Sequence, residues 1–119
     1  MANKLVSDDI NTINYILEQI GICTQFITNM NLNEFLSDIK TCYAVSMNLQ
    51  VICENANHIT DKTKNMSKKI EWDKMSGLRN LISHDYGKIM FEDMYHTVVN
   101  DLPTLQSELE QLLKKIDKL

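Results

Sequence analysis

Residues 7–28 read SDDINTINYILEQIGICTQFIT, and this stretch decides the fold class. Its apolar side chains recur at steps of three and four residues, or at their sum, which is the spacing of one face of an α-helix. Ser7 or Asp8 can cap the helix, and the acidic pair Asp8 and Asp9 suits its positive first turn. The residues that define the face are Ile10, Ile13, Leu17, Ile20 and Ile27.

Working outward, a break at 29–31 precedes a second long helix, predicted over 33–58 and antiparallel to the first. The side chains expected to face its core are Phe35, Leu36, Ile39, Tyr43, Met47, Leu49, Ile52 and Ala56. Polar, lysine-rich residues 59–68 indicate the longest connection. A third helix is predicted from Glu71 to Ser83, with Gly87 able to turn the chain just beyond it.

The C-terminal part predicts helix over 91–100, an interruption at Pro103 and a final helix through Leu105 to Ile116. Proline cannot donate an interior helix hydrogen bond, so either two helices or one kinked helix results, with Asp101 able to cap the new start. The chain has three glycines and one proline, too few for the turns of a sheet protein. We therefore expect an all-α, up-down four-helix bundle with a short additional helix before the C-terminal one.

Length and composition favour one domain over residues 1–119, with dimerisation helping so small a core. No stretch reaches the roughly 18 apolar residues of a membrane span, and acidic residues stand where a signal peptide would be basic. A cytoplasmic protein is expected, without membrane association. The three cysteines have no CxxC spacing and are predicted to be buried thiols, so no metal site is expected: Cys23, Cys42 and Cys53.

Charge is distributed unevenly, although the net charge of −4 argues against a general nucleic-acid binder. Residues 61–88 hold seven basic and four acidic side chains, a local charge of +3, and the remainder carries −7. Such a strip is compatible with a passing RNA backbone and equally with an acidic partner.

The positive strip contains the only arginine, Arg79, at the start of the octet RNLISHDY, residues 79–86. Arg79 can bind a phosphate through paired hydrogen bonds, and His84 can exchange a proton near neutral pH. Residues five apart lie about 140° around a helix axis, so the two cannot share one face of a continuous helix. They can meet if the helix ends there, or across a two-fold dimer interface that gathers two copies of each.

These groups suit cleavage of RNA by its own 2′-hydroxyl, with His84 moving the proton and Arg79 stabilising the charge on the pentavalent phosphate. Asn80 can orient the imidazole or bind a phosphate oxygen. The reaction requires neither a metal nor a cofactor. Taken alone, an arginine and a histidine near a helix end are more often an ion pair with Asp85 or a helix cap. His58 and His96 are expected to be structural.

The pattern Arg-x4-His-x-Tyr in a helical bundle resembles the HEPN superfamily, and specifically its HepT-like toxins. Ile70-Glu71-Trp72 before the octet, Gly77-Leu78 leading into it and Asp101-Leu102-Pro103 after it extend the resemblance over most of residues 70–116. Glu71 departs from the proline of many relatives, which concerns the start of the third helix.

The resemblance implies the toxin of a type VII-like toxin–antitoxin system: a homodimeric, metal-independent endoribonuclease with Arg79 and His84 as its catalytic pair and Asn80 in support. The implied partner is a minimal nucleotidyltransferase antitoxin, which would transfer AMP to Tyr86 and so place phosphate charge beside Arg79. The alternative is a non-catalytic helical module that binds a nucleotidyltransferase or a nucleotide. A plain structural dimerisation bundle is a third possibility.

Overall fold

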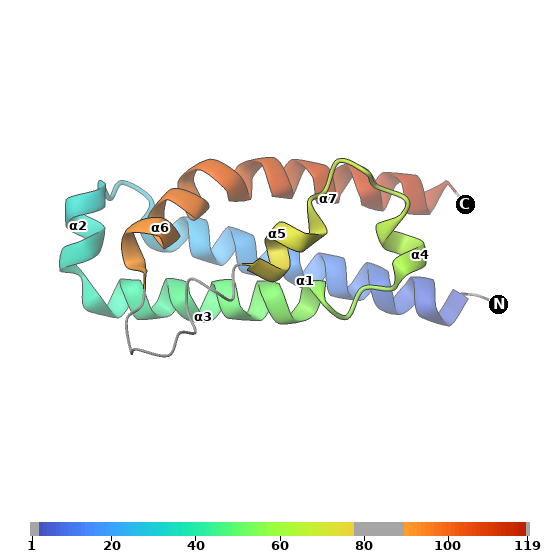
Figure 1. Ribbon diagram of the computed structural model, residues 1–119, viewed down its shortest axis with the longest axis horizontal. Coiled ribbons are helices and arrows are strands. Elements are labelled where there is room, and N and C mark those ends of the chain that lie inside the picture. Colours follow the sequence, from blue (N-terminus) through green and yellow to red (C-terminus); the bar gives the residue numbers. More distant parts are fainter. Residues whose placement is uncertain (1–2, 78–89, 119) are drawn as a thin grey trace.

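Three long helical rods lie side by side, and short helices connect them (Figure 1). The computed structural model describes residues 3–77 and 90–118. The first two rods are α1 (Asn3–Ile27) and α3 (Ile39–Ala56). The third rod consists of three consecutive helical segments: α6 (Phe91–His96), the π-helical turn η2 (Thr97–Asp101) and α7 (Leu102–Asp117). The described chain contains no strand, so the predicted all-α bundle is confirmed.

The core forms where α1, α3 and the third rod face one another. Its aliphatic side chains are fully or almost fully buried, and burying each one contributes roughly 1.5–3 kcal/mol. The largest of them include Ile13, Ile16 and Ile20 of α1, Leu49 and Ile52 of α3, and Leu109 and Leu112 of α7. The predicted antiparallel pairing of the first two long helices is confirmed (Figure 1).

Helix α1 begins at Asn3, earlier than the predicted caps at Ser7 or Asp8. Asp9 therefore lies inside the helix, where it is 2% exposed. Its carboxylate accepts hydrogen bonds from the Thr60 backbone N–H at 3.2 Å, from the Thr60 hydroxyl at 2.6 Å and from the Thr63 hydroxyl. These three hydrogen-bond donors replace the water molecules that the carboxylate loses on burial. Asp9 thus attaches the segment after α3 to the first helix.

The predicted helix over 33–58 is interrupted at Asp38, which separates α2 (Leu32–Ser37) from α3. Asn31 and Glu34 form a capping box at the start of α2, with reciprocal bonds of 2.8 and 3.0 Å. Asp38 then caps α3 by accepting from the Thr41 backbone N–H at 3.2 Å. Two N-caps seven residues apart give two helices, and the chain changes direction between them.

The interruption also corrects the predicted core face of this region. Four of the eight residues expected to be buried are exposed to between 41% and 61%: Leu36, Ile39, Tyr43 and Met47. The face that packs on α1 instead carries Cys42, Val45 and Cys53 beside the correctly predicted Leu49 and Ile52. We call Leu36, Ile39, Tyr43 and Met47 the exposed stripe.

The connection after α3 contains one helical turn, α4 (Asp61–Lys64), where sequence alone indicated only loop. Helix α5 (Trp72–Gly77) then begins one residue after the predicted Glu71. Backbone N–H groups of Lys74 and Met75 donate to the Glu71 carbonyl at 2.9 and 3.2 Å. Glu71 thus lies immediately before α5, so its difference from the proline of many relatives concerns the start of this helix. The rest of the predicted third helix, 78–83, lies outside the described residues.

Pro103 does not break the third rod. The rod stays helical because η2 precedes it, with the Leu102 N–H donating to the Thr97 carbonyl five residues back. Pro103 occupies the first turn of α7, where its missing N–H is tolerated. Asp101 makes no side-chain cap, so that expectation was wrong. Within residues 3–77 and 90–118, no helix has the length and apolar character to cross a membrane.

Candidate functional site

The octet lies outside the described residues, and with it the predicted catalytic pair Arg79 and His84, the supporting Asn80 and the modification site Tyr86. The structure therefore does not describe how these four side chains lie relative to one another. The structure does describe the chain up to Gly77 and again from Met90. These two flanks show where the motif is attached to the bundle.

The N-terminal flank is anchored by apolar side chains of the connection and α5. Ile70 and Met75 are 4% and 3% exposed, and α5 packs against α3. Trp72 is partly buried, and the Lys64 ammonium lies 5.8 Å from its ring centroid, within range of a cation–π interaction. Helix α5, which precedes the octet, is therefore fixed to the core through Met75, and Lys64 lies over its Trp72 ring.

The C-terminal flank is anchored mainly by aromatic contacts. Phe91 packs edge-to-face on Tyr43 of α3, with ring centroids 5.6 Å apart. Tyr95 packs on Phe35 at 5.4 Å and donates its hydroxyl hydrogen bond to the Met30 carbonyl at 2.7 Å. Both described flanks of the octet thus pack against α3, the helix that carries most of the exposed stripe.

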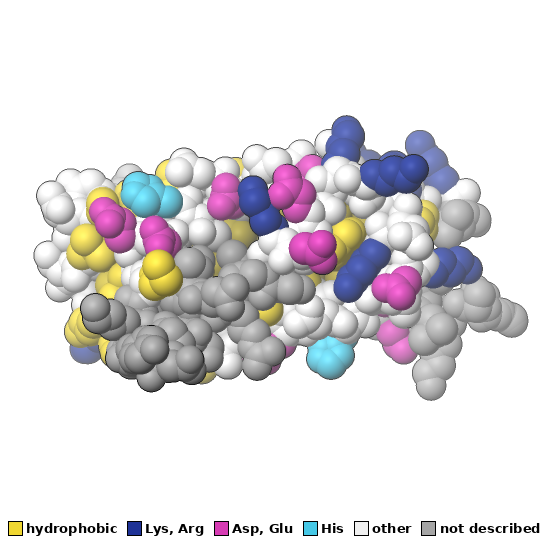
Figure 2. Space-filling model, in the orientation of Figure 1, with side chains coloured by type: hydrophobic (Ala, Val, Ile, Leu, Met, Phe, Trp, Pro, Cys, Tyr) yellow, Lys and Arg dark blue, Asp and Glu magenta, His cyan; other side chains and the backbone are white. Residues whose placement is uncertain are grey.

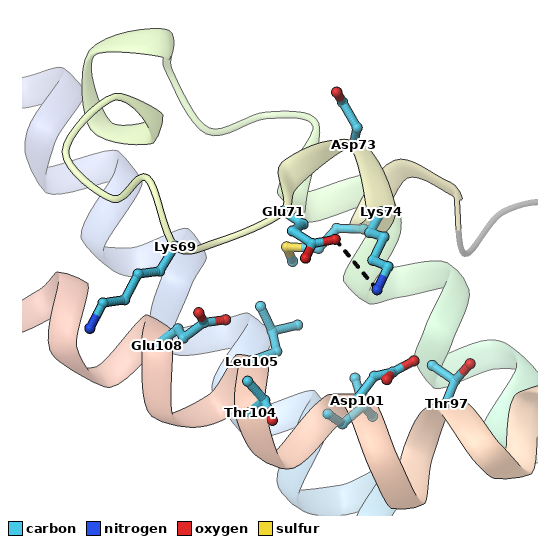
Figure 3. A pocket seen from close by; sticks show the side chains of 11 residues that line it. Lys69, Glu71, Asp73, Lys74, Thr97, Asp101, Thr104, Leu105 and Glu108 are labelled. Atoms are coloured by element: carbon cyan, nitrogen blue, oxygen red, sulfur yellow. Dashed lines mark ion pairs between the residues drawn. The ribbon is translucent and has the colours of Figure 1, made fainter.

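A groove of about 640 Å³ lies between α5 on one side and η2 with the first half of α7 on the other (Figure 3). Its apolar lining comes from Met75, Leu102 and Leu105. Among the described residues, its charged lining comprises Glu71, Asp73, Asp101 and Glu108 against Lys69 and Lys74, a formal charge of −2. Lys74 forms an exposed ion pair with Glu71 at 3.4 Å.

This acidic groove was not predicted from the sequence, because its two walls are about thirty residues apart in the chain. No local spacing brings these two walls together; the packing of α5 on α3 is what places it opposite η2 and α7. Its excess of carboxylates opposes the entry of a phosphate group. The described lining therefore disfavours an RNA backbone in this groove.

The described histidines and cysteines do not form a second reactive centre. His58 and His96 are both exposed, and no group of three histidine, cysteine or acidic side chains in the described ranges could hold a metal ion. Burial raises the pKa of the Cys23 thiol to about 12, and burial together with the nearby Asp38 carboxylate raises that of Cys42. All three cysteines are buried and none forms a disulfide, as predicted.

Comparison with known proteins places this small helical bundle in a class of ribonuclease domains. The family model for "Ribonuclease HepT-like" matches residues 16–112, which include the whole octet. This chain belongs to the HepT-like ribonuclease family, so the resemblance to HepT-like HEPN domains is confirmed.

Curated relatives span almost the same length. "Putative RNase MJ0127" of Methanocaldococcus jannaschii is 32% identical over 102 residues, covering 86% of this chain and 84% of that protein. "Probable ribonuclease HepT" of Thermococcus cleftensis is 30% identical over 99 residues, covering 83% and 90%. "Putative RNase MJ1380" of M. jannaschii is 30% identical over 95 residues, covering 80% and 87%. No solved structure is significantly similar to the chain.

Proposed function

We propose that this protein is a metal-independent endoribonuclease toxin of a toxin–antitoxin system, with Arg79 and His84 as its catalytic pair. The observation that carries the proposal is the family match to a ribonuclease over residues 16–112, because that range includes both side chains. The RNase names of the relatives add support. The substrate is RNA, and the protein acts in the cytoplasm.

The two side chains supply what cleavage by the 2′-hydroxyl needs. The His84 imidazole takes a proton from the attacking hydroxyl or gives one to the departing 5′-oxygen. The Arg79 guanidinium stabilises the charge that develops on the phosphate oxygens, and Asn80 holds the imidazole or a phosphate oxygen in place. The nucleophile is the substrate's own oxygen, so neither a protein nucleophile nor a metal-bound water is required.

The active form is a homodimer whose two octets form one composite site. The exposed stripe supports this part of the proposal. Its four large apolar side chains lie on α2 and α3, and one of them, Tyr43, contacts Phe91 at the start of α6. Met90, which comes directly after the undescribed segment, is also 45% exposed. An apolar surface beside the C-terminal flank of the motif suits an interface that would bring two motifs together.

The regulatory part of the proposal concerns Tyr86. An antitoxin nucleotidyltransferase transfers AMP from ATP to the Tyr86 hydroxyl, forming a phosphodiester bond and releasing pyrophosphate. The added phosphate competes with substrate for Arg79 and repels an incoming RNA backbone. Intact-mass and peptide mass spectrometry of this protein, co-expressed with the nucleotidyltransferase, should find AMP on Tyr86. An adduct found only at another residue would refute this assignment.

The central experiment compares Arg79→Ala and His84→Ala with His58→Ala and Lys74→Ala, which remove an exposed histidine and an exposed lysine outside the motif. Wild-type protein should stop growth when expressed alone and cleave RNA in the presence of EDTA. The motif variants should lose at least about 100-fold in cleavage rate and become harmless, because each removes a group that acts in the transition state. The control variants should remain toxic and active.

Harmless expression of the wild type, with RNA left intact by the purified dimer, would favour the second candidate, a non-catalytic module that binds a nucleotidyltransferase. The acidic groove supports this candidate, because its volume of about 640 Å³ and its apolar lining residues can receive a protein side chain. The charge of −2 on its described lining disfavours a free nucleotide as the occupant.

A further inference from the structure

Lysines that are distant in the sequence gather at one end of the bundle (Figure 2). The first group lies on α4 and the connection that follows it: Lys62, Lys64, Lys68 and Lys69. In Figure 1 this end also holds the C-terminus of α7, which contributes a second group. That group is Lys114, Lys115 and Lys118, and all three are exposed.

A hydrogen bond joins the two groups directly. The Lys115 ammonium donates to the Met66 carbonyl at 3.1 Å, so the last turns of α7 pack against the connection between α4 and α5. We call the surface formed by residues 61–69 and 113–118 the lysine pole. It holds seven lysines and the two carboxylates of Asp61 and Asp117, a formal charge of +5. The rest of the chain then carries −9, since the whole carries −4.

The pole is held in place by contacts that do not use most of its lysines. The buried Asp9 carboxylate binds Thr60 and Thr63, which fixes α4 on the first helix. Among the contacts of the described residues, Lys64, over the Trp72 ring, and Lys115 are the pole lysines that take part. An anchored backbone has little conformational freedom left to lose on binding, which lowers the cost of association with a polyanion.

We propose that the lysine pole binds the phosphodiester backbone of the RNA substrate outside the octet. This inference rests on the proposed function for the identity of the polyanion. A surface of charge +5 releases counterions from an RNA backbone, while the acidic groove and the acidic remainder repel it. The charge distribution therefore selects one end of the molecule for the flanking RNA. Lysine contacts to phosphate carry no sequence information, so the pole contributes affinity and orientation.

The test uses the full-length protein with His84→Ala, so that RNA stays intact, and two single-stranded RNAs of different sequence. The pole variant Lys68→Gln/Lys114→Gln removes one exposed lysine from each group. The matched control Lys40→Gln/Lys74→Gln removes two exposed lysines outside the pole, so both variants change net charge equally. Binding is measured by fluorescence anisotropy at several salt concentrations.

The pole variant should weaken binding to both RNAs by the same factor. It should also lower the slope of log affinity against log salt by about 1.4, which corresponds to the loss of two single-strand phosphate contacts. The control should leave affinity within about twofold, the scale on which near-neutral surface changes act. Equal losses in both variants would mean a general charge effect and overturn the proposal, as would no loss in either. Lysine-dependent binding to phosphatidylglycerol vesicles, with no such effect on RNA, would reassign the pole to a membrane surface.

This outcome is separable from that of the proposed nuclease. If wild-type protein leaves RNA intact, the anisotropy measurement still decides whether the pole binds it. If wild-type protein cleaves RNA, the pole variant in the otherwise native chain should raise KM several-fold and leave kcat unchanged, because the lysines hold substrate without touching the reacting phosphate. A fall in kcat with KM unchanged would contradict the assignment.

Discussion

Helix α3 presents two apolar faces with different environments. One face packs on α1 and is fully buried, with Val45, Leu49 and Ile52 at 0% exposure. The other belongs to the exposed stripe, where Tyr43 and Met47 are 56% and 61% exposed. Large apolar side chains that are exposed next to one another on a helix indicate a surface that a partner can cover. The contrast separates residues that stabilise the fold from residues available for association.

The largest expected effect is a difference in stability between changes at Leu49, on the buried face, and at Met47, on the exposed stripe. Leu49→Ala should lower the free energy of unfolding by about 2–5 kcal/mol, because it leaves a cavity in a close-packed core. Met47→Ala should change it by less than about 0.5 kcal/mol in the monomer. Urea unfolding of dilute protein measures both. Similar losses at the two positions would show that the faces are not distinct.

The next effect concerns association. Tyr43→Glu with Met47→Glu should raise the dimer dissociation constant at least tenfold, about 1.4 kcal/mol, because two charges would be buried in the proposed interface. Lys40→Glu/Gln50→Glu, two exposed polar positions of the same helix, serves as the control. Sedimentation equilibrium at micromolar concentrations gives both constants. A dimer unaffected by the first pair would place the interface on another surface.

The smallest effect concerns Cys23, which lies in the core that the buried face of α3 helps to form. Burial raises its pKa from 9.0 to about 12, so between these values the unfolded chain releases a proton that the folded chain retains. The contribution to stability is complete below pH 9 and falls as pH rises above it. From pH 9 to 10, wild type should lose on the order of 1 kcal/mol more than Cys23→Ala. Parallel pH profiles would disprove the effect.

The sequence predicted the features that depend on local periodicity. The helical class, the pairing of the first two long helices and the burial of all three cysteines follow from apolar spacing and from the scarcity of glycine and proline. The break at Asp38 could also have been predicted, since Asn31 with Glu34 forms a capping signature and Asp38 precedes a second apolar run. Treating 33–58 as one helix assigned exposed side chains to the core.

The groove and the lysine pole could not have been predicted in the same way. Each joins segments that are far apart in the chain, as Lys115 and Met66 are by 49 residues, and their meeting depends on how the helices pack. The candidate catalytic residues show the opposite case. Arg79, Asn80, His84 and Tyr86 were selected by motif and chemistry, and they lie outside the described residues, so their convergence stays a prediction.

The π-helical turn η2 places a constraint on chain length in an exposed position. Val99, Asn100 and Asp101 are all exposed, and surface positions of this kind ordinarily accept gain or loss of a residue. Here, the turn already holds one residue more than α-helical spacing, so deleting one residue would return it to that spacing and leave the side chains after it in phase. Leu109, Leu112 and Ile116 would then stay in the core. A second added residue would instead rotate them by about 100° around the axis, so one-residue deletions at 99–101 should be tolerated in evolution and insertions should not.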